Sequence, residues 1–322
     1  MRTKPMVREG LLLLSESRLA RRLASDVPFA RGIARRFVAG ETLDDAAAAA
    51  RHLNDGGMTV SLDYLGEAVT SRAEAEQARA LILASVDRIA ADGLDANVSV
   101  KLTQLGQDID EAFLRDNTRR ILDRAGEHDL FVRFDMEGSP YTQRTLEFFE
   151  SLWAEGRRNC GVVLQSYLYR TEQDVRRMNQ IGARVRLCKG AYSEPPEIAF
   201  PDKADVDANF VQLMRALLAE GNYPGIATHD EAMIRATKQF ANEQGIGLDR
   251  LEFQMLFGVR RDLQRELVRE GYNLRIYVPF GEAWYPYFMR RMAERPANLV
   301  FIVGSVLRES PFGVVMPSRN GR

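Results

Sequence analysis

Eight short runs rich in β-branched residues recur along the chain, and each run ends in polar residues or glycine. Their starts lie 22 to 40 residues apart, which leaves room for one helix between successive runs. A strand, a crossover helix and a further strand predict parallel pairing. The eight runs cover residues 58–65, 97–102, 131–136, 160–168, 184–190, 224–230, 251–258 and 273–281.

Eight such repeats over about 250 residues are what a closed barrel requires, although a doubly wound open sheet would share the alternation. We therefore expect an α/β fold in which residues 56–322 form a TIM-type (β/α)8 barrel, the catalytic domain. Residues 1–55 carry helical patterns without a strand-like run, and we expect an N-terminal helical arm there. The apolar run 11–14 fits the core-facing side of this arm, with membrane contact as the alternative.

Composition narrows the possible partners. The chain of 322 residues holds 44 basic and 45 acidic residues, so no charge excess favours nucleic acid or an anionic bilayer. No apolar stretch approaches the roughly 18 residues of a membrane span, and the start of the chain has no convincing secretion signal. Cys160 and Cys188 each sit in an apolar run, which predicts buried free thiols rather than a disulfide. We expect a cytoplasmic protein.

The ends of the runs are polar. A barrel of this kind builds its ligand site at the carboxyl-terminal ends of its strands, where this sequence places Lys101, Asp135 and Lys189. Burying such charges is costly unless they are paired or meet a polar ligand. Alternation along residues 184–190 predicts that Arg186 faces the barrel interior.

Each of these residues also has a simpler interpretation. Lys101 and Asp135 could be a plain ion pair or surface charges, and His229 fits a hydrogen-bonded structural residue as well as a ligand contact. Gly190 in "LCKGAY" could present backbone N–H groups to a phosphate together with Lys189. The sequence has no HExxH, no CxxC and no carboxylate cluster at ligand spacing, so we expect no metal.

Several motifs together resemble the proline dehydrogenase family, in the right order over about residues 58 to 300. They are "VSVKLTQLG", "FVRFDMEGSPYT", "VVLQSYLYRT", "VRLCKGAY", "ATHD", "EFQMLFG", "RIYVPFG" and "YFMRRMAERPAN". The length resembles the monofunctional bacterial type, because bifunctional members continue into an aldehyde dehydrogenase domain. The resemblance implies oxidation of L-proline to 1-pyrroline-5-carboxylate, with hydride passing from C5 to N5 of FAD. It also implies a quinone as electron acceptor, and hence at most peripheral contact with the inner membrane.

The resemblance also assigns roles to residues. Arg290 and Arg291 would bind the substrate carboxylate, with Glu294 orienting the pair. Asp135 and Arg186 match catalytic positions, and Arg186 would lie near the flavin N5. The other substrate-binding matches are Lys101, Tyr192, Leu256, Tyr277 and Tyr287. The cofactor-binding matches are Met136, Gln165, Arg186, Lys189, Gly190, Ala191, Thr228 and His229.

Two other functions stay open at this point. Lysines at barrel strand ends often form Schiff bases, so Lys101 or Lys189 could make the protein an aldolase-type lyase. A binding or scaffold protein that keeps the barrel without its chemistry is the third possibility. If the resemblance holds, the bulk of Tyr277 resembles the proline-specific members, and we expect proline to be strongly preferred.

Overall fold

Residues 36–284 fold around a closed barrel of eight parallel strands. The computed structural model describes residues 36–66, 68–285 and 287–289. Each strand pairs with the next along the chain, and β1 also pairs with β8. The expected (β/α)8 barrel is confirmed, and the doubly wound sheet is excluded. The strands are β1 Thr59–Tyr64, β2 Ala96–Val100, β3 Val132–Phe134, β4 Cys160–Gln165, β5 Arg184–Cys188, β6 Gly225–Ala227, β7 Glu252–Leu256 and β8 Leu274–Phe280.

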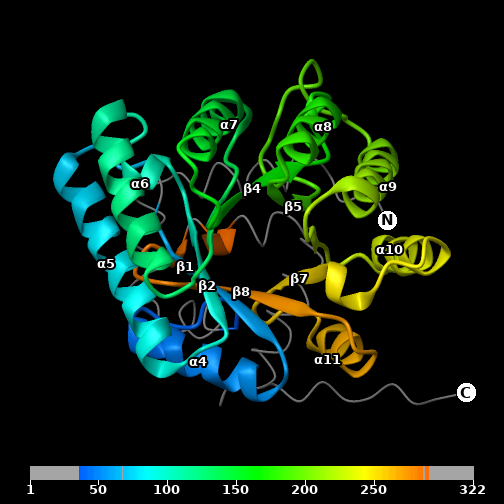
Figure 1. Ribbon diagram of the computed structural model, residues 1–322, viewed down its shortest axis with the longest axis horizontal. Coiled ribbons are helices and arrows are strands. Elements are labelled where there is room, and N and C mark those ends of the chain that lie inside the picture. The colour runs from blue at the N-terminus through cyan, green and yellow to red at the C-terminus, as the bar shows by residue number, and fades with distance from the viewer. Residues whose placement is uncertain (1–35, 67, 286, 290–322) are drawn as a thin grey trace, which may run out of the picture. The chain divides into compact units, whose positions relative to one another are not determined.

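Helices alternate with the strands and surround them (Figure 1). Helix α5 begins with a capping box between Ser71 and Glu74, and it ends where Gly93 adopts a left-handed conformation. No helix of the described chain is both long enough and apolar enough to span a membrane. The helices are α4 Leu43–Asp55, α5 Arg72–Asp92, α6 Glu111–Gly126, α7 Ser139–Ala154, α8 Thr171–Ile181, α9 Lys203–Glu220, α10 Glu231–Glu243 and α11 Arg261–Arg269, with short 3₁₀ helices η1 Thr103–Leu105 and η2 Leu248–Arg250.

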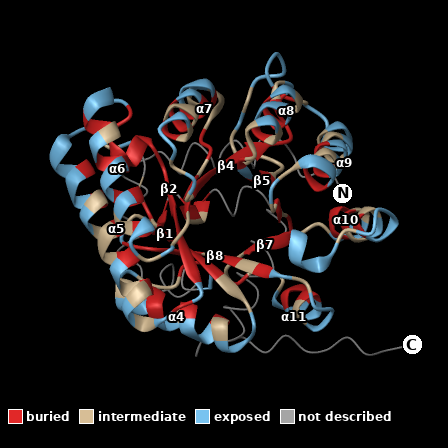
Figure 2. Cartoon of the chain, in the orientation of Figure 1, coloured by how far each residue is buried: buried red, intermediate tan, exposed pale blue. Residues whose placement is uncertain are grey.

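The apolar core lies between the strands and the inner faces of the helices (Figure 2). Phe134 of β3, for example, packs edge-on against Phe149 of α7, with ring centroids 6.2 Å apart. The other face of the strands is polar. Arg186 of β5 donates a hydrogen bond to Ser61 of β1, and since these strands are not neighbours, the contact crosses the barrel interior. The alternation of strand side chains thus separates an apolar outer layer from a polar interior.

The chain divides into two compact units, and residues 36–284 form the one that contains the barrel. Helix α4, which the sequence analysis assigned to the N-terminal arm, belongs to this unit and packs against β1 and β8. The predicted arm over residues 1–35 lies outside the described residues. The domain boundary expected at residue 55 stays a prediction.

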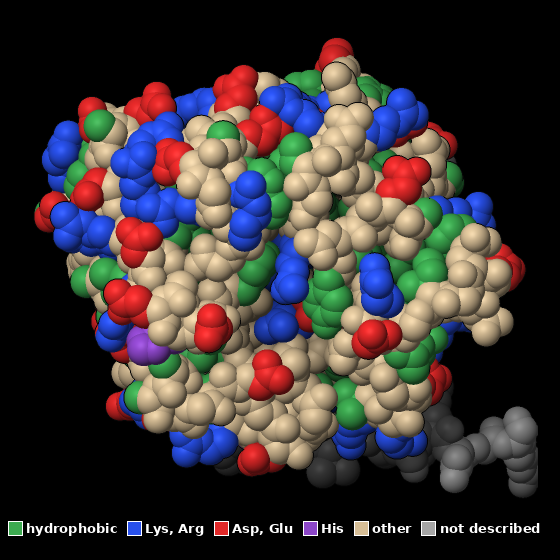
Figure 3. Space-filling model, viewed as in Figure 1, with side chains coloured by type: hydrophobic (Ala, Val, Ile, Leu, Met, Phe, Trp, Pro, Cys, Tyr) green, Lys and Arg blue, Asp and Glu red, His purple; other side chains and the backbone are tan. Residues whose placement is uncertain are grey.

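Two further features of the described chain bear on the composition arguments. Cys160 and Cys188 are both free thiols, as expected, but only Cys160 is buried as predicted, whereas Cys188 is half-buried. On the face drawn in Figure 3, acidic and basic side chains are interspersed over the surface. This face therefore presents no continuous surface of one charge.

Candidate active site

The carboxyl-terminal ends of the strands bring the predicted polar residues together at one end of the barrel. Lys101 directly follows β2, Asp135 directly follows β3, and Arg186 lies in β5. Tyr277 lies in β8. These four residues and Asp63, near the end of β1, are hereafter the mouth cluster.

Arg186 is the central cation of the mouth cluster. Its side chain is 8% exposed, and its guanidinium donates to Asp135 Oδ1 at 2.8 Å and to Gln254 Oε1. Weaker bonds reach Ser61 Oγ at 3.4 Å and Ser99 Oγ at 3.3 Å. The prediction that this arginine faces the barrel interior is confirmed. Because strands on several sides supply its acceptors, the guanidinium is fixed in orientation before any ligand arrives.

Asp135 connects three members of the mouth cluster. Its Oδ2 accepts a hydrogen bond from the hydroxyl of Tyr277 at 2.7 Å, while Oδ1 accepts from Arg186. Lys101 Nζ lies 3.7 Å from the same Oδ2. Burial raises the pKa of Tyr277 well above its usual value, and the charge of Asp135 adds to the shift. The phenol is therefore a neutral donor at physiological pH.

Asp63 is a site residue that the sequence analysis missed. Lys101 Nζ donates to Asp63 Oδ1 at 2.9 Å, and the Asp63 side chain is 0% exposed. Its Oδ2 is buried and has no hydrogen-bond partner among the described residues. Burial raises the pKa of this carboxyl group, Lys101 opposes the rise, and the negative charge of Asp135 adds to it. The simple Lys101–Asp135 pair is thus part of a larger arrangement, in which the nearer partner of Lys101 is Asp63.

Several residues assigned to cofactor binding line the adjoining strand ends. Gln165, the last residue of β4, is 3% exposed, and its Oε1 is buried without a hydrogen-bond partner in the described chain. Thr228 is buried and directly follows β6. Met136 is also buried and lies just after β3. His229 accepts a hydrogen bond at Nε2 from the backbone N–H of Leu256 at 2.9 Å. That bond supports the structural interpretation of His229 and joins the ends of β6 and β7.

Lys189 does not present an unpaired charge. Its ammonium donates to Asp207 of α9 and to Asp230, which lies just before α10. The distance to Asp230 is 2.7 Å. Lys203 approaches the same two carboxylates, Asp230 at 3.4 Å. Burial alone would raise the pKa of Asp230, but its hydrogen bond and charge contact with Lys189 lower that pKa to about 2. The strand end is thus held against α9 and α10.

The loop after β5 holds Gly190, Ala191 and Tyr192, all half-buried. Glu194 anchors this loop, because it accepts from the backbone N–H of Ser139 at 2.7 Å and from the hydroxyl of Tyr167 at 3.3 Å. Ser139 begins α7, so the carboxylate sits at a helix N-terminus. The loop that carries these predicted cofactor contacts is therefore tied to two other loops.

A chain of polar contacts continues below the mouth cluster. Gln254 Oε1 accepts from Arg186, while its Nε2 donates to Glu252. Glu252 pairs with Arg275 at 3.0 Å, and Arg275 donates to the carbonyl of Val60 at 2.7 Å. Burial would raise the pKa of Glu252, but the charge and hydrogen bonds of Arg275 lower it. These contacts, hereafter the inner polar network, connect Arg186 to the amino-terminal end of the barrel.

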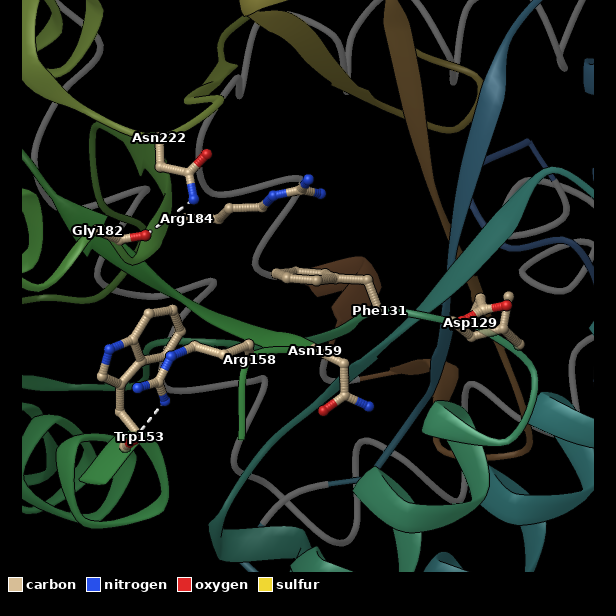
Figure 4. Close-up of a pocket in the computed structure, with 9 residues that line it drawn as sticks. Asp129, Phe131, Trp153, Arg158, Asn159, Gly182, Arg184 and Asn222 are labelled. Atoms are coloured by element: carbon tan, nitrogen blue, oxygen red, sulfur yellow. Dashed lines mark hydrogen bonds between the residues drawn. The ribbon is translucent and has the colours of Figure 1, made fainter. Parts of the chain in front are cut away.

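The amino-terminal ends of the strands form a separate cavity of about 500 Å³. Figure 4 shows Arg158 and Asn222 donating to backbone carbonyls within it. Arg184 stacks on the rings of Phe131 and Tyr223, with its Cζ 5.3 and 5.2 Å from their centroids. Barrel enzymes build their active sites at the carboxyl-terminal ends of the strands, so we place the candidate active site at the other end.

Four of the predicted substrate contacts are not placed at the mouth by the structure. Arg290, Arg291 and Glu294 lie outside the described residues, and Tyr287 belongs to the other compact unit. Their roles stay predictions. Among the side chains that the structure describes, no group of three or more His, Cys, Asp and Glu residues is arranged to hold a metal ion.

The closed barrel and its charged carboxyl-terminal end define the class as a (β/α)8-barrel enzyme. Residues 46–303 match the model of the proline dehydrogenase family. Proline dehydrogenase 1 of Bacillus subtilis subsp. natto is 40% identical over 304 residues, covering 94% of this chain and 100% of that protein. Proline dehydrogenase of Deinococcus radiodurans is 41% identical over 307 residues, covering 94% of this chain and 98% of that protein. The chain belongs to the proline dehydrogenase family.

A solved structure agrees with this assignment. Proline utilization A from Bdellovibrio bacteriovorus, inactivated by N-propargylglycine, superposes with a TM-score of 0.79 at 28% identity. The match covers 95% of this chain but only 38% of that longer one. The chain is therefore an oxidoreductase of proline catabolism, acting at its first step.

Proposed function

We propose that the protein oxidises L-proline to 1-pyrroline-5-carboxylate, with FAD as its cofactor and a quinone as electron acceptor. The mouth cluster carries this proposal, because it fixes a guanidinium, an ammonium, a carboxylate and a phenol within contact of one another. Family membership supplies the reaction class.

The residues expected to hold FAD fit such a group. Gln165 carries a buried acceptor that lacks a partner in the described chain, which is what a site for a polar ligand leaves behind. Gly190 supplies a stretch of backbone without a side chain, and its loop is anchored by Glu194. Met136, Gln165, the Lys189–Ala191 segment, Thr228 and His229 stand at the ends of four neighbouring strands. A long cofactor can therefore contact all of them along one arc.

When bound, FAD would supply at N5 the two-electron acceptor for the hydride that leaves C5 of proline. Arg186 is the residue that would favour negative charge developing beside it, since its guanidinium is held rigidly by Asp135 and Gln254. The ring nitrogen of proline must be neutral when the hydride leaves, and a desolvated site lowers the pKa of an ammonium. Lys101 and Asp135 would orient the polar edge of the substrate, and Tyr277 and Leu256 would pack against its ring.

The lyase alternative is disfavoured by the ion pairs of the two candidate lysines. Lys101 lies between Asp63 and Asp135, and Lys189 contacts Asp207 and Asp230. A Schiff base needs a lysine nitrogen that is free to attack a carbonyl, whereas both of these nitrogens are engaged by carboxylates.

The visible absorbance spectrum of the purified protein tests the proposal directly. We expect a flavin band that bleaches on anaerobic addition of L-proline and reappears on addition of a soluble quinone. A band that proline leaves intact would overturn the substrate assignment. A colourless protein that does not bind added FAD would overturn the cofactor, and borohydride trapping with a carbonyl substrate would then test the lyase.

The carboxylate clamp has its own test. Arg290→Ala or Arg291→Ala should raise KM for proline at least about tenfold, because each removes a charge-assisted contact worth roughly 1.5–3 kcal/mol. FAD content should change little. Arg176→Ala is the matched control, since Arg176 is exposed on α8 and its ion pair in the described part of the chain is with Glu172. Unchanged KM in both variants would remove the clamp.

A further inference from the structure

The second carboxylate of the mouth cluster has no role in the proposed reaction so far. Asp63 comes one residue before the end of β1, level with Ser99 of β2 and Pro279 of β8. Strand alternation turns it, like Ser61, to the barrel interior. A fully buried carboxylate is expensive, so its presence calls for a compensating function.

The geometry shows how Lys101 divides its contacts. Asp63 Oδ1 is its near acceptor at 2.9 Å, and Asp135 Oδ2 is the distant one at 3.7 Å. Asp135 is already engaged by Arg186 on one oxygen and by Tyr277 on the other. Without Asp63, the nearer of these two carboxylate contacts is lost, and the remaining one is to an oxygen that Tyr277 already occupies.

The charges of the mouth cluster lead to the same conclusion. Counted by formal charge, Asp63 and Asp135 match Lys101 and Arg186 within the mouth cluster. Removal of Asp63 leaves the mouth cluster with two cations and one carboxylate. Lys101 would then move toward Asp135, where it would disturb the acceptor of both Arg186 and Tyr277.

We propose that Asp63 is a positioning residue, which holds the ammonium of Lys101 where it meets the substrate and keeps it away from Asp135. Asp63 acts through Lys101 and does not itself contact proline. The inference rests on the proposed function, because Lys101 is a substrate contact only if proline binds at this mouth.

A double-mutant cycle in the flavin-loaded enzyme tests the inference. Asp63→Asn keeps the shape and removes the charge, and we expect KM for proline to rise about tenfold while kcat changes less than about threefold. Lys101→Met should raise KM as well. If Asp63 acts only through Lys101, adding Asp63→Asn to Lys101→Met should change KM less than about twofold.

Asp174→Asn is the matched control. Asp174 is a buried carboxylate on α8 that pairs with Arg170 at 2.7 Å and is not part of the mouth cluster. The Asp174→Asn substitution should lower the melting temperature and leave KM for proline unchanged. If Asp63→Asn does not fold, Asp63→Glu serves instead, because it keeps the charge and displaces it by one methylene. Its KM is also expected to rise.

Two results would overturn the inference. One is a KM for proline that neither Asp63 variant changes. The other is an equal effect of Asp63→Asn with and without Lys101, which would show an action independent of the lysine. Wild-type enzyme whose flavin is not bleached by proline would instead overturn the proposed function, so the two failures are distinguishable.

Discussion

Replacement of Gly190 by alanine should damage the loop that carries the expected cofactor contacts. Gly190 has φ of +111°, a conformation that residues with a side chain rarely adopt. A Cβ there would lie 2.4 Å from Cδ1 and 2.5 Å from Cε1 of Tyr167. Tyr167 is buried, its backbone N–H donates to Lys189 at 2.9 Å, and its carbonyl accepts from Phe200 at 2.8 Å. The ring therefore has little freedom to move aside.

The expected magnitude has two parts. The strained backbone costs about 1–3 kcal/mol, and overpacking against the ring costs about 1–3 kcal/mol more. The sum, about 2–6 kcal/mol, is a large share of the roughly 5–15 kcal/mol by which a folded protein is stable. At about 2 °C per kcal/mol for a protein of this size, the melting temperature should fall by about 4–12 °C.

Gly182→Ala separates the two parts. Gly182 also has positive φ, +72°, but an added Cβ there meets nothing within 4 Å. Its conformation is close to the left-handed helical region, so only about 1–2 kcal/mol is expected. Thermal unfolding of both variants, with the FAD content measured in parallel, should show the larger loss of stability and cofactor for Gly190→Ala alone. Equal shifts in the two variants would refute the argument from Tyr167.

Three further predictions follow from the described contacts. Because the pKa of Asp230 is lowered to about 2 in the folded protein, the stability it contributes is present above about pH 4 and is lost as pH falls toward 2; urea midpoints of wild type and Asp230→Asn should therefore converge at low pH. Burial raises the pKa of Cys160 to about 12, so a thiol reagent at pH 8 should label this cysteine only after unfolding; rapid labelling of native protein would contradict its burial. Tyr277→Phe removes the 2.7 Å bond to Asp135 and should lower kcat/KM for proline about tenfold, with an unchanged far-UV circular dichroism spectrum; unaltered kinetics would show that the hydroxyl is dispensable.

The barrel was predictable because its signals are local. Each strand run has its own apolar face and polar end, and helix stops such as Gly93 mark the intervening segments. The interior placement of Arg186 also followed from alternation within one strand. The same reasoning applied to "TVSLDY" would have turned Ser61 and Asp63 inward. Asp63 was not predicted, because it precedes the last residues of its run, where polar site residues are expected.

The pairing inside the mouth cluster was not predictable in the same way. Which side chains meet across a barrel depends on the stagger between strands, and stagger is set by the whole closed sheet. Thus the sequence offered Lys101 with Asp135, whereas the closer partner is Asp63 on the other neighbouring strand. The partners of Lys189 likewise come from α9 and the start of α10, distant segments whose packing no local pattern encodes.

The inner polar network from Arg186 through Gln254 to Glu252 limits which substitutions this barrel can accept. An amide side chain has two unlike ends, and here the nitrogen of Gln254 is directed at Glu252 and its oxygen at Arg186. Glu252 therefore determines which end of the amide the active arginine meets. Residues at the amino-terminal end of such a barrel ordinarily serve stability. In this protein a basic residue at position 252 would reverse the amide and turn a donor toward Arg186, so the two ends of the barrel cannot be optimised separately.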